Sequence, residues 1–261
     1  MDALLHYKTY LALNKNSQNP VLFILHGLLG SMDSWRTQAK RLSQFRTIIT
    51  VDLRNHGHSP HSNDMSYKKM ALDIIALIKH KKLTKIDLIG HSMGGKIAMW
   101  LALHYPAHVR KLIIVDIAPK TYPLWHQKIL VAMLKAPLFQ FQTRKEIDQY
   151  LSTTIEDNIE TTFLTKNVQR LPNGGYEWRC NLAVIVTSYL KIAGFPVPDL
   201  IFTNPTLFIY GDNSPYIKLD DHRLIKSLFT HSQIQSIDHS GHLPHIEQPD
   251  EFYHCIKRFL T

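Results

Sequence analysis

The sequence has little cysteine and no long apolar run. Only Cys180 and Cys255 occur, and neither has a neighbouring cysteine at metal-ligand spacing, so neither a disulfide framework nor a zinc ribbon is predicted. No apolar stretch approaches the ~18 residues of a membrane span, and Asp2, His6 and Lys8 interrupt the start, where a secretory signal is apolar. We therefore expect a cytoplasmic protein without a stable membrane anchor.

Acidic residues are fewer than basic ones. Asp and Glu number 21 against 30 Lys and Arg, giving a net charge of +9, which suits an acidic partner such as nucleic acid or a phosphorylated substrate. The basic residues are scattered, however, and the densest cluster, 79–85, ends a helical pattern, where cations favour the negative end of the helix dipole. The charge therefore predicts no nucleic-acid partner.

Short apolar runs alternate with helical patterns through much of the chain. Runs typical of strands buried on both faces lie at residues 21–25, 47–51, 86–89, 112–115, 206–210 and 233–237. Helices are predicted over residues 34–44, 67–79, 96–105 and 251–260. This alternation indicates an α/β fold with a mostly parallel sheet and helices on both faces. A hairpin over residues 4–13 is expected to add antiparallel strands at one edge.

The alternation stops after Pro119. Residues 122–199 form a mostly helical pattern without a strong strand before Thr206, and proline and glycine are frequent at both ends. We therefore predict a core of residues 1–121 and 200–261, with residues 122–199 inserted as a helical cap. Six apolar cap residues are expected to pack in the cap core, with a pocket lining as the alternative: Tyr122, Trp125, Met133, Leu134, Phe139 and Phe141.

A glycine-rich turn follows the strand predicted at 86–89. The sequence Gly-His-Ser-Met-Gly-Gly occupies positions 90–95, directly before a predicted helix. Glycines on either side of Ser92 allow strand and helix to approach closely, so that the serine hydroxyl projects from the end of the sheet. This is the context of a nucleophile elbow. We predict Ser92 as a catalytic nucleophile, against the alternative of a tight structural turn.

A serine hydroxyl needs a base to remove its proton, and sixteen histidines are present. In the fold that the elbow indicates, the base follows the last strand, where residues 238–245 contain three histidines. His242 is the preferred base because Gly241 frees the backbone before it and a helix start follows it. His239 and His245 are expected to be loop residues without a catalytic role.

Two backbone amides are candidates for an oxyanion hole. The amide of Met93, the residue after the nucleophile, is one donor. The other is expected from Leu28, because the sequence His-Gly-Leu-Leu-Gly at 26–30 follows a predicted strand and its glycines let the backbone turn inward. His26 is expected to be a structural hydrogen-bonding residue.

These motifs resemble the α/β-hydrolase superfamily. Together with Asp-Leu-Arg-Asn-His-Gly at 52–57, Val-Asp-Ile-Ala-Pro at 115–119 and Asn-Ser-Pro-Tyr at 213–216, they look most like the bacterial YbfF-type esterases and their ABHD11-like relatives. The resemblance implies a serine hydrolase of small-molecule substrates, short to medium acyl esters or acyl-CoA thioesters. It also implies that no metal or organic cofactor takes part.

The acid of the triad departs from the superfamily pattern. Most members carry an aspartate where this chain has Ser214, and a serine cannot supply the negative charge. We therefore assign Asp116, which follows the strand predicted at 112–115, with a structural turn carboxylate as the alternative. Asp212 is the main rival for the role, and Ser214 is expected to be a secondary hydrogen-bond partner near His242.

Other interpretations stay open at this point. Arg54, Asn55 and His56 follow a strand end, and a turn-stabilising network is preferred there over substrate contact. The same motifs also resemble a cofactor-free lyase of menaquinone synthesis and carbon–carbon bond hydrolases. A non-enzymic receptor of the same fold is disfavoured because Ser92 and His242 are both present.

Overall fold

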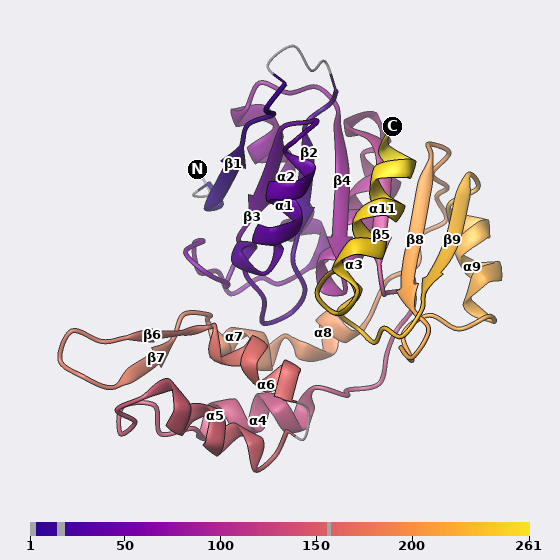
Figure 1. The fold of residues 1–261 in the computed structure, drawn as a ribbon. Helices are drawn as coiled ribbons and strands as arrows, with labels where there is room; N and C mark the ends of the chain where they lie inside the picture. Colours follow the sequence, from indigo (N-terminus) through magenta and orange to yellow (C-terminus); the bar gives the residue numbers. More distant parts are fainter. Residues whose placement is uncertain (1–3, 15–18, 156–157) are drawn as a thin grey trace.

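One seven-stranded sheet forms the centre of the protein (Figure 1). The computed structural model describes residues 4–14, 19–155 and 158–261. The strand order is β1-β3-β2-β4-β5-β8-β9, and every neighbouring pair is parallel except β1 and β3. The strands are β1 (Tyr7–Tyr10), β2 (Leu22–Leu25), β3 (Ile48–Val51), β4 (Ile86–His91), β5 (Val109–Val115), β8 (Thr206–Gly211) and β9 (Ser232–Ile237). The predicted α/β fold is thus confirmed.

Helices cover both faces of the sheet. Successive residues of the central strands point to opposite faces, and all of them are buried. One face packs against α1 and α11, and the other against α2, α3 and α9. The bounds are α1 (Arg36–Leu42), α2 (Tyr67–His80), α3 (Met93–His104), α9 (Asp221–Leu228), α10 (Pro244–Glu247) and α11 (Pro249–Leu260), with 3₁₀ turns at Met32–Trp35 and Pro106–His108. None of the helices in the described part of the chain is both long and apolar enough to cross a bilayer.

The hairpin predicted over residues 4–13 is wrong. This segment forms the single strand β1, which pairs antiparallel with β3 from Tyr7 opposite Val51 to Tyr10 opposite Ile48. The segment contains no glycine, proline or asparagine to form a tight turn, so the chain stays extended. It therefore joins the sheet edge as one strand.

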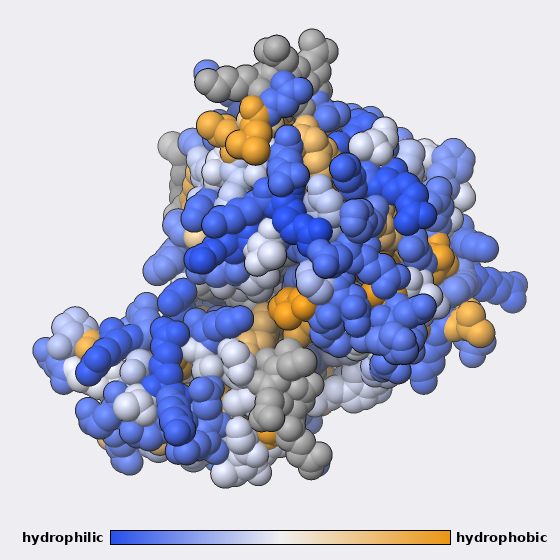
Figure 2. Space-filling view, in the orientation of Figure 1, coloured by the Kyte–Doolittle hydropathy of each residue, from blue (hydrophilic) through white to orange (hydrophobic). Residues whose placement is uncertain are grey.

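The segment between β5 and β8 forms a separate layer next to one end of the sheet (Figure 1). Its regular elements are helices apart from one pair of short strands, and we call residues 122–199 the cap. Its elements are α4 (Gln127–Lys135), α5 (Arg144–Ser152), α6 (Asn158–Thr165), β6 (Val168–Arg170), β7 (Tyr176–Trp178), α7 (Leu182–Thr187) and α8 (Tyr189–Ala193). The molecular surface is largely hydrophilic in the view of Figure 2, with smaller hydrophobic patches between the two layers, near the top and at the right edge.

The antiparallel pair β6–β7 adds two short strands to the segment of residues 122–199, where no strong strand was expected. Its turn contains Gly174 and Gly175, whose φ values of 91° and 73° lie in the left-handed region that glycine adopts readily. The sequence Asn-Gly-Gly at 173–175 is a recognised turn signal. The strands escaped prediction because each has only three residues, too few for a clear alternation.

Candidate active site

Ser92 lies at a sharp turn between β4 and α3, with φ 52° and ψ −118°. The turn is possible because Gly90 and Gly94 lack side chains: a Cβ on Gly90 would lie 2.3 Å from the Gly94 carbonyl oxygen. The Ser92 amide donates to the carbonyl of Val115, which anchors the turn to the next strand at 3.0 Å. Helix α3 begins at Met93, three residues earlier than predicted, so its first amide directly follows the serine.

His242 and Asp116 lie in direct contact, as the sequence predicted. His242 Nδ1 is 2.6 Å from Asp116 Oδ2. Asp116 is fully buried at the end of β5 and has a left-handed backbone with φ 51°. The His242 ring stacks on Tyr216, with centroids 3.8 Å apart, and His91 Nε2 donates to the His242 carbonyl at 2.8 Å. Neighbours thus fix both the ring and the backbone of His242.

The structure separates the two other acid-site candidates. The Ser214 hydroxyl donates to Asp116 Oδ2, the same oxygen that contacts His242. Asp212 is exposed, and its Oδ1 accepts the Ser240 amide at 3.1 Å, so it caps a loop next to β9. Ser214 therefore contacts the Asp116–His242 pair, whereas the Asp212 carboxylate binds a backbone amide of the neighbouring loop.

Burial shifts the protonation of this pair. It raises the pKa of Asp116, while hydrogen bonds from the Ser214 hydroxyl and the Gly211 amide act in the opposite direction. Burial also lowers the pKa of His242, which favours the neutral imidazole that can accept a proton. The described residues contain no hydrogen bond between Ser92 and His242, and such bonds are often formed only when substrate is present.

The loop of residues 26–30 approaches Ser92 from β2. His26 Nδ1 donates to the Gly27 carbonyl at 2.7 Å and its Nε2 accepts the Leu53 amide at 3.0 Å, which confirms a structural role for this histidine. Within the described part of the chain, the amides of Leu28 and Met93 are absent from the backbone pairs of turns and loops. Both residues line a cavity next to Ser92.

Two cavities of about 40 Å³ and about 640 Å³ meet at Ser92. Five residues line both: Leu28, Ser92, Trp125, His126 and Tyr216. His242 lines the large cavity but not the small one, whereas Met93 and Lys96 line the small cavity but not the large one. Ser92 therefore separates a small space on the oxyanion side from a large one on the side of the histidine.

Comparison with known proteins identifies the family. A family model described as the alpha/beta hydrolase fold matches residues 20–249. The chain belongs to this family. It is 37% identical to the sn-1-specific diacylglycerol lipase ABHD11 of Mus musculus, over 97% of this chain and 85% of that protein. It is 33% identical to Esterase YbfF of Escherichia coli (strain K12), over 98% of this chain and 99% of that protein.

A solved structure agrees with this assignment. The marine microorganism esterase has a TM-score of 0.93 and 36% identity to this chain, covering 98% of this chain and 99% of its own. The resemblance to YbfF-type and ABHD11-like hydrolases predicted from the motifs is thus confirmed.

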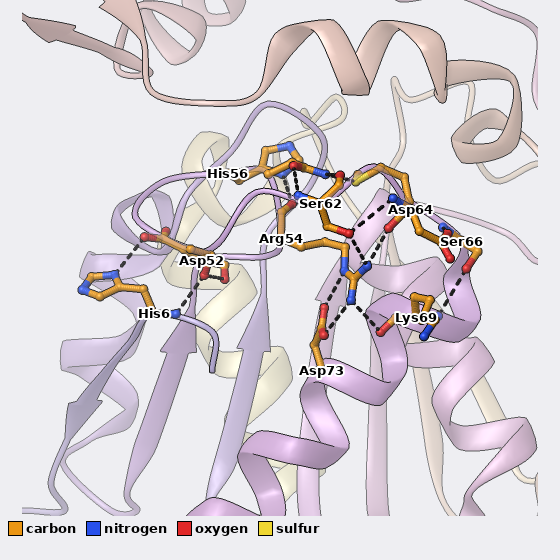
Figure 3. Close-up of polar contacts among 12 residues, drawn as sticks. His6, Asp52, Arg54, His56, Ser62, Asp64, Ser66, Lys69 and Asp73 are labelled. Carbon is orange, nitrogen blue, oxygen red and sulfur yellow. Dashed lines mark hydrogen bonds and ion pairs between the residues drawn. The ribbon is translucent and has the colours of Figure 1, made fainter. Parts of the chain in front are cut away.

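The turn after β3 in this α/β hydrolase is held by a polar network (Figure 3). Arg54 contacts Asp73 through Nε at 2.6 Å and Nη2 at 2.7 Å, and Nη1 donates to the Asp64 carbonyl at 2.6 Å. His56 and Asn55 bond to backbone groups on either side. The predicted turn-stabilising network is confirmed. In the described residues, no group of three or more His, Cys, Asp or Glu side chains is arranged to hold a metal ion.

Several residues of the hydrolase site had no sequence signal of their own. His126 Nδ1 is hydrogen-bonded to the Tyr189 hydroxyl at 3.0 Å, and burial lowers the pKa of His126 to about 4. Burial lowers the pKa of Lys96 to about 7, and its Nζ donates to the carbonyls of Ala193 and Gly194 at 2.7 and 2.9 Å. These contacts join distant segments, which no local pattern reveals.

The cap-core role expected for the six apolar cap residues holds for only some of them. Met133 is buried, and Phe141 packs partly buried against the core. Tyr122 and Trp125 line the small cavity at Ser92. Leu134 and Phe139 are 49% and 70% exposed, so the expectation is wrong for them.

His239 is an exposed loop residue as expected, and its carbonyl accepts from Gln248. The expected loop position is wrong for His245, which is buried in α10 and stacks on Trp35 with centroids 4.2 Å apart.

Proposed function

We propose that this protein is a serine carboxylic ester hydrolase with Ser92 as nucleophile, His242 as base and Asp116 as acid. One observation carries the proposal: the Asp116–His242 pair and the elbow serine meet at one cavity, with His242 Nδ1 2.6 Å from Asp116 Oδ2. This is the constellation that activates a hydroxyl nucleophile.

Acylation begins with attack of Ser92 Oγ on the ester carbonyl. His242 Nε2 takes the hydroxyl proton, and Asp116 holds Nδ1–H, which fixes the tautomer and stabilises the imidazolium. The amides of Leu28 and Met93 donate to the oxyanion of the tetrahedral intermediate. When the intermediate collapses, the carbon–oxygen bond to the alcohol breaks and His242 returns the proton to the leaving alcohol.

Deacylation repeats these steps with water. His242 removes a proton from a water molecule as it attacks the acyl carbon, and the second intermediate releases the carboxylic acid and the Ser92 hydroxyl. Each residue is regenerated, and neither step needs a cofactor.

The two cavities suggest where each half of the ester binds. His242 must reach the leaving oxygen to protonate it, so the alcohol belongs in the large cavity, which His242 lines. The acyl group then occupies the small cavity on the oxyanion side. Its volume of about 40 Å³ is far below the about 640 Å³ of the large cavity, so we propose a short acyl group on a larger alcohol.

The net charge of +9 suggests an acyl-CoA thioester as an alternative substrate. The large cavity is mostly apolar, and the described residues lining it include no Lys or Arg to pair with phosphate groups. Lys96 lines the small cavity, but its Nζ already donates to backbone carbonyls. The cavity therefore favours neutral esters.

A panel of nitrophenyl esters of rising acyl length, with acyl-CoAs of the same lengths, tests the proposal. We expect release of nitrophenol to be fastest with the shortest acyl groups and to disappear in Ser92→Ala, together with labelling by a fluorophosphonate. Equal turnover by purified Ser92→Ala would refute the serine mechanism. Release of acid from a simple ester also distinguishes hydrolysis from the lyase alternative.

A further inference from the structure

The backbone of Leu29, next to the proposed oxyanion donor Leu28, is held by side chains from both layers. Leu29 has a φ of 58°, a left-handed conformation that costs a non-glycine residue about 1 kcal/mol or more. Its amide donates to His56 Nε2 at 3.1 Å. Its carbonyl accepts a hydrogen bond from the side-chain amide of Asn167, which belongs to the cap. Both polar backbone groups of this strained residue are thus fixed.

A chain of hydrogen bonds leads from Asn167 to the Leu28 amide. The Leu29 carbonyl, which Asn167 holds, shares a peptide unit with the Gly30 amide. The Gly30 amide donates to the Gly27 carbonyl at 3.1 Å, and that carbonyl shares a peptide unit with the Leu28 amide. Each peptide unit is planar, so fixing one end orients the other, and successive hydrogen bonds polarise one another.

We infer that Asn167 is a positioning residue that aims the Leu28 amide at the oxyanion, so that the oxyanion hole is complete only while the cap is docked. The inference rests on the proposed function. Asn167 suits this role because it is 3% exposed, and its own carbonyl accepts the Arg179 amide at 2.7 Å, which ties it to the cap. Cap docking and catalytic competence are therefore coupled through one side chain.

Other hydrogen bonds hold the cap without touching the oxyanion loop. The Tyr67 hydroxyl donates to the Ile192 carbonyl at 2.5 Å, and the Asn181 amide donates to the Asn55 carbonyl at 2.8 Å. Removing one of several such bonds leaves the cap attached. Tyr67→Phe is therefore a matched control, because it deletes one bond between core and cap at a site away from Leu28.

Kinetics separate positioning from simple docking. In Asn167→Leu we expect kcat for a short nitrophenyl ester to fall roughly 10- to 100-fold, less than the loss of a whole oxyanion donor, with KM nearly unchanged. The affinity for a trifluoromethyl ketone, which mimics the tetrahedral intermediate, should fall by the same factor. Tyr67→Phe should stay within about threefold of the wild type in both measurements. Equal losses in Asn167→Leu and Tyr67→Phe, or an unchanged ketone affinity in Asn167→Leu, would overturn the inference.

Hydrogen exchange of the backbone amides tests the same arrangement without activity. The amides of Leu29 and Gly30 should exchange faster in Asn167→Leu, and also in the near-isosteric Asn167→Asp, than in the wild type or Tyr67→Phe. Unchanged protection in both Asn167 variants would overturn the inference whatever the activity. Failure of the proposed function would appear differently. Either the wild type would not hydrolyse esters, or Ser92→Ala would hydrolyse them as fast as the wild type.

Discussion

The two walls of the active site are built in different ways. The core wall carries Ser92 and Asp116 at strand ends, in left-handed backbone conformations that hydrogen bonds to neighbouring strands hold. The cap wall consists of short helices and a hairpin, and it leaves Phe139 and Leu190 70% and 73% exposed. The core fixes the residues proposed to react, whereas the cap shapes the space around them and holds the Leu29 carbonyl through Asn167.

This difference sets what each wall can tolerate. A change in the core wall should alter rate or folding, because the reacting groups share backbone contacts with the sheet. A change in a cap side chain that lines the cavities should alter which ester is accepted, because these side chains do not join the Asp116–His242 pair. Asn167 differs from them, since it holds the Leu29 carbonyl and should alter the rate. Substitutions matched between the walls test this division.

The largest effect is expected at the core carboxylate. Asp116→Asn should keep the geometry but lower ester turnover by roughly 10⁴-fold, the scale seen when a triad acid is made neutral. Asp212→Asn is the control, and it should change turnover little because Asp212 caps the loop at Ser240. Steady-state kinetics of both purified variants decide the assignment. A crippled Asp212→Asn beside an active Asp116→Asn would reverse it.

The next effect concerns folding, and it compares a glycine from each wall. A Cβ at Gly94 would lie 2.5 Å from the His26 carbonyl oxygen and 2.7 Å from that of Leu25, so Gly94→Ala should cost about 3 kcal/mol of unfolding free energy or more. The ~1 kcal/mol that alanine gains over glycine in a helix cannot offset this clash. Gly194 in the cap has an extended backbone and no atom nearer than 3.5 Å.

Gly194→Ala should therefore change the unfolding free energy by less than about 1 kcal/mol. Urea denaturation followed by circular dichroism measures both variants. Similar stability of Gly94→Ala and Gly194→Ala would show that the elbow is not packed as tightly as the backbone distances indicate.

A smaller effect is expected from Ser214, which stabilises ionised Asp116. Its hydroxyl lowers the pKa of Asp116 against the effect of burial, so Ser214→Ala should raise that pKa further. Because the carboxylate must be ionised to support His242, activity is lost as the pH falls through this pKa. The acid limb of kcat/KM should move to higher pH by roughly one unit, while activity at alkaline pH is retained. A pH profile with an unmoved acid limb would contradict this.

The sheet could be predicted because the patterns of its strands and helices are local. The proposed site residues were chosen because each follows a predicted strand. Ser92 lies in a strand–turn–helix motif, and a parallel sheet brings the segments after its strands to one edge, which places Asp116 near His242. The contacts of Asn167 and His126 were not predictable, because their partners lie far away in sequence. The hairpin expected over residues 4–13 was wrong because the prediction rested on apolar alternation and overlooked the lack of turn residues in this segment.

The smallest effect, a change of selectivity, should come from the cap wall of the small cavity. Ile192 is 4% exposed and lines this cavity, whereas only its backbone carbonyl contacts Tyr67 and Lys96. Ile192→Ala removes three carbon atoms from the wall while keeping those backbone contacts. We expect kcat/KM for butyrate or hexanoate nitrophenyl esters to rise relative to acetate by about 10-fold, since one or two methylenes in an apolar pocket are worth roughly 1–3 kcal/mol. The absolute rate with acetate should fall only a few-fold, because Ser92 and His242 lie on the core wall.

Leu190→Ala, at an exposed cap position, is the control and should leave the acyl-length profile unchanged. If Ile192→Ala lowers all esters equally, the acyl group does not occupy the small cavity, and the division of the ester between the two cavities is wrong.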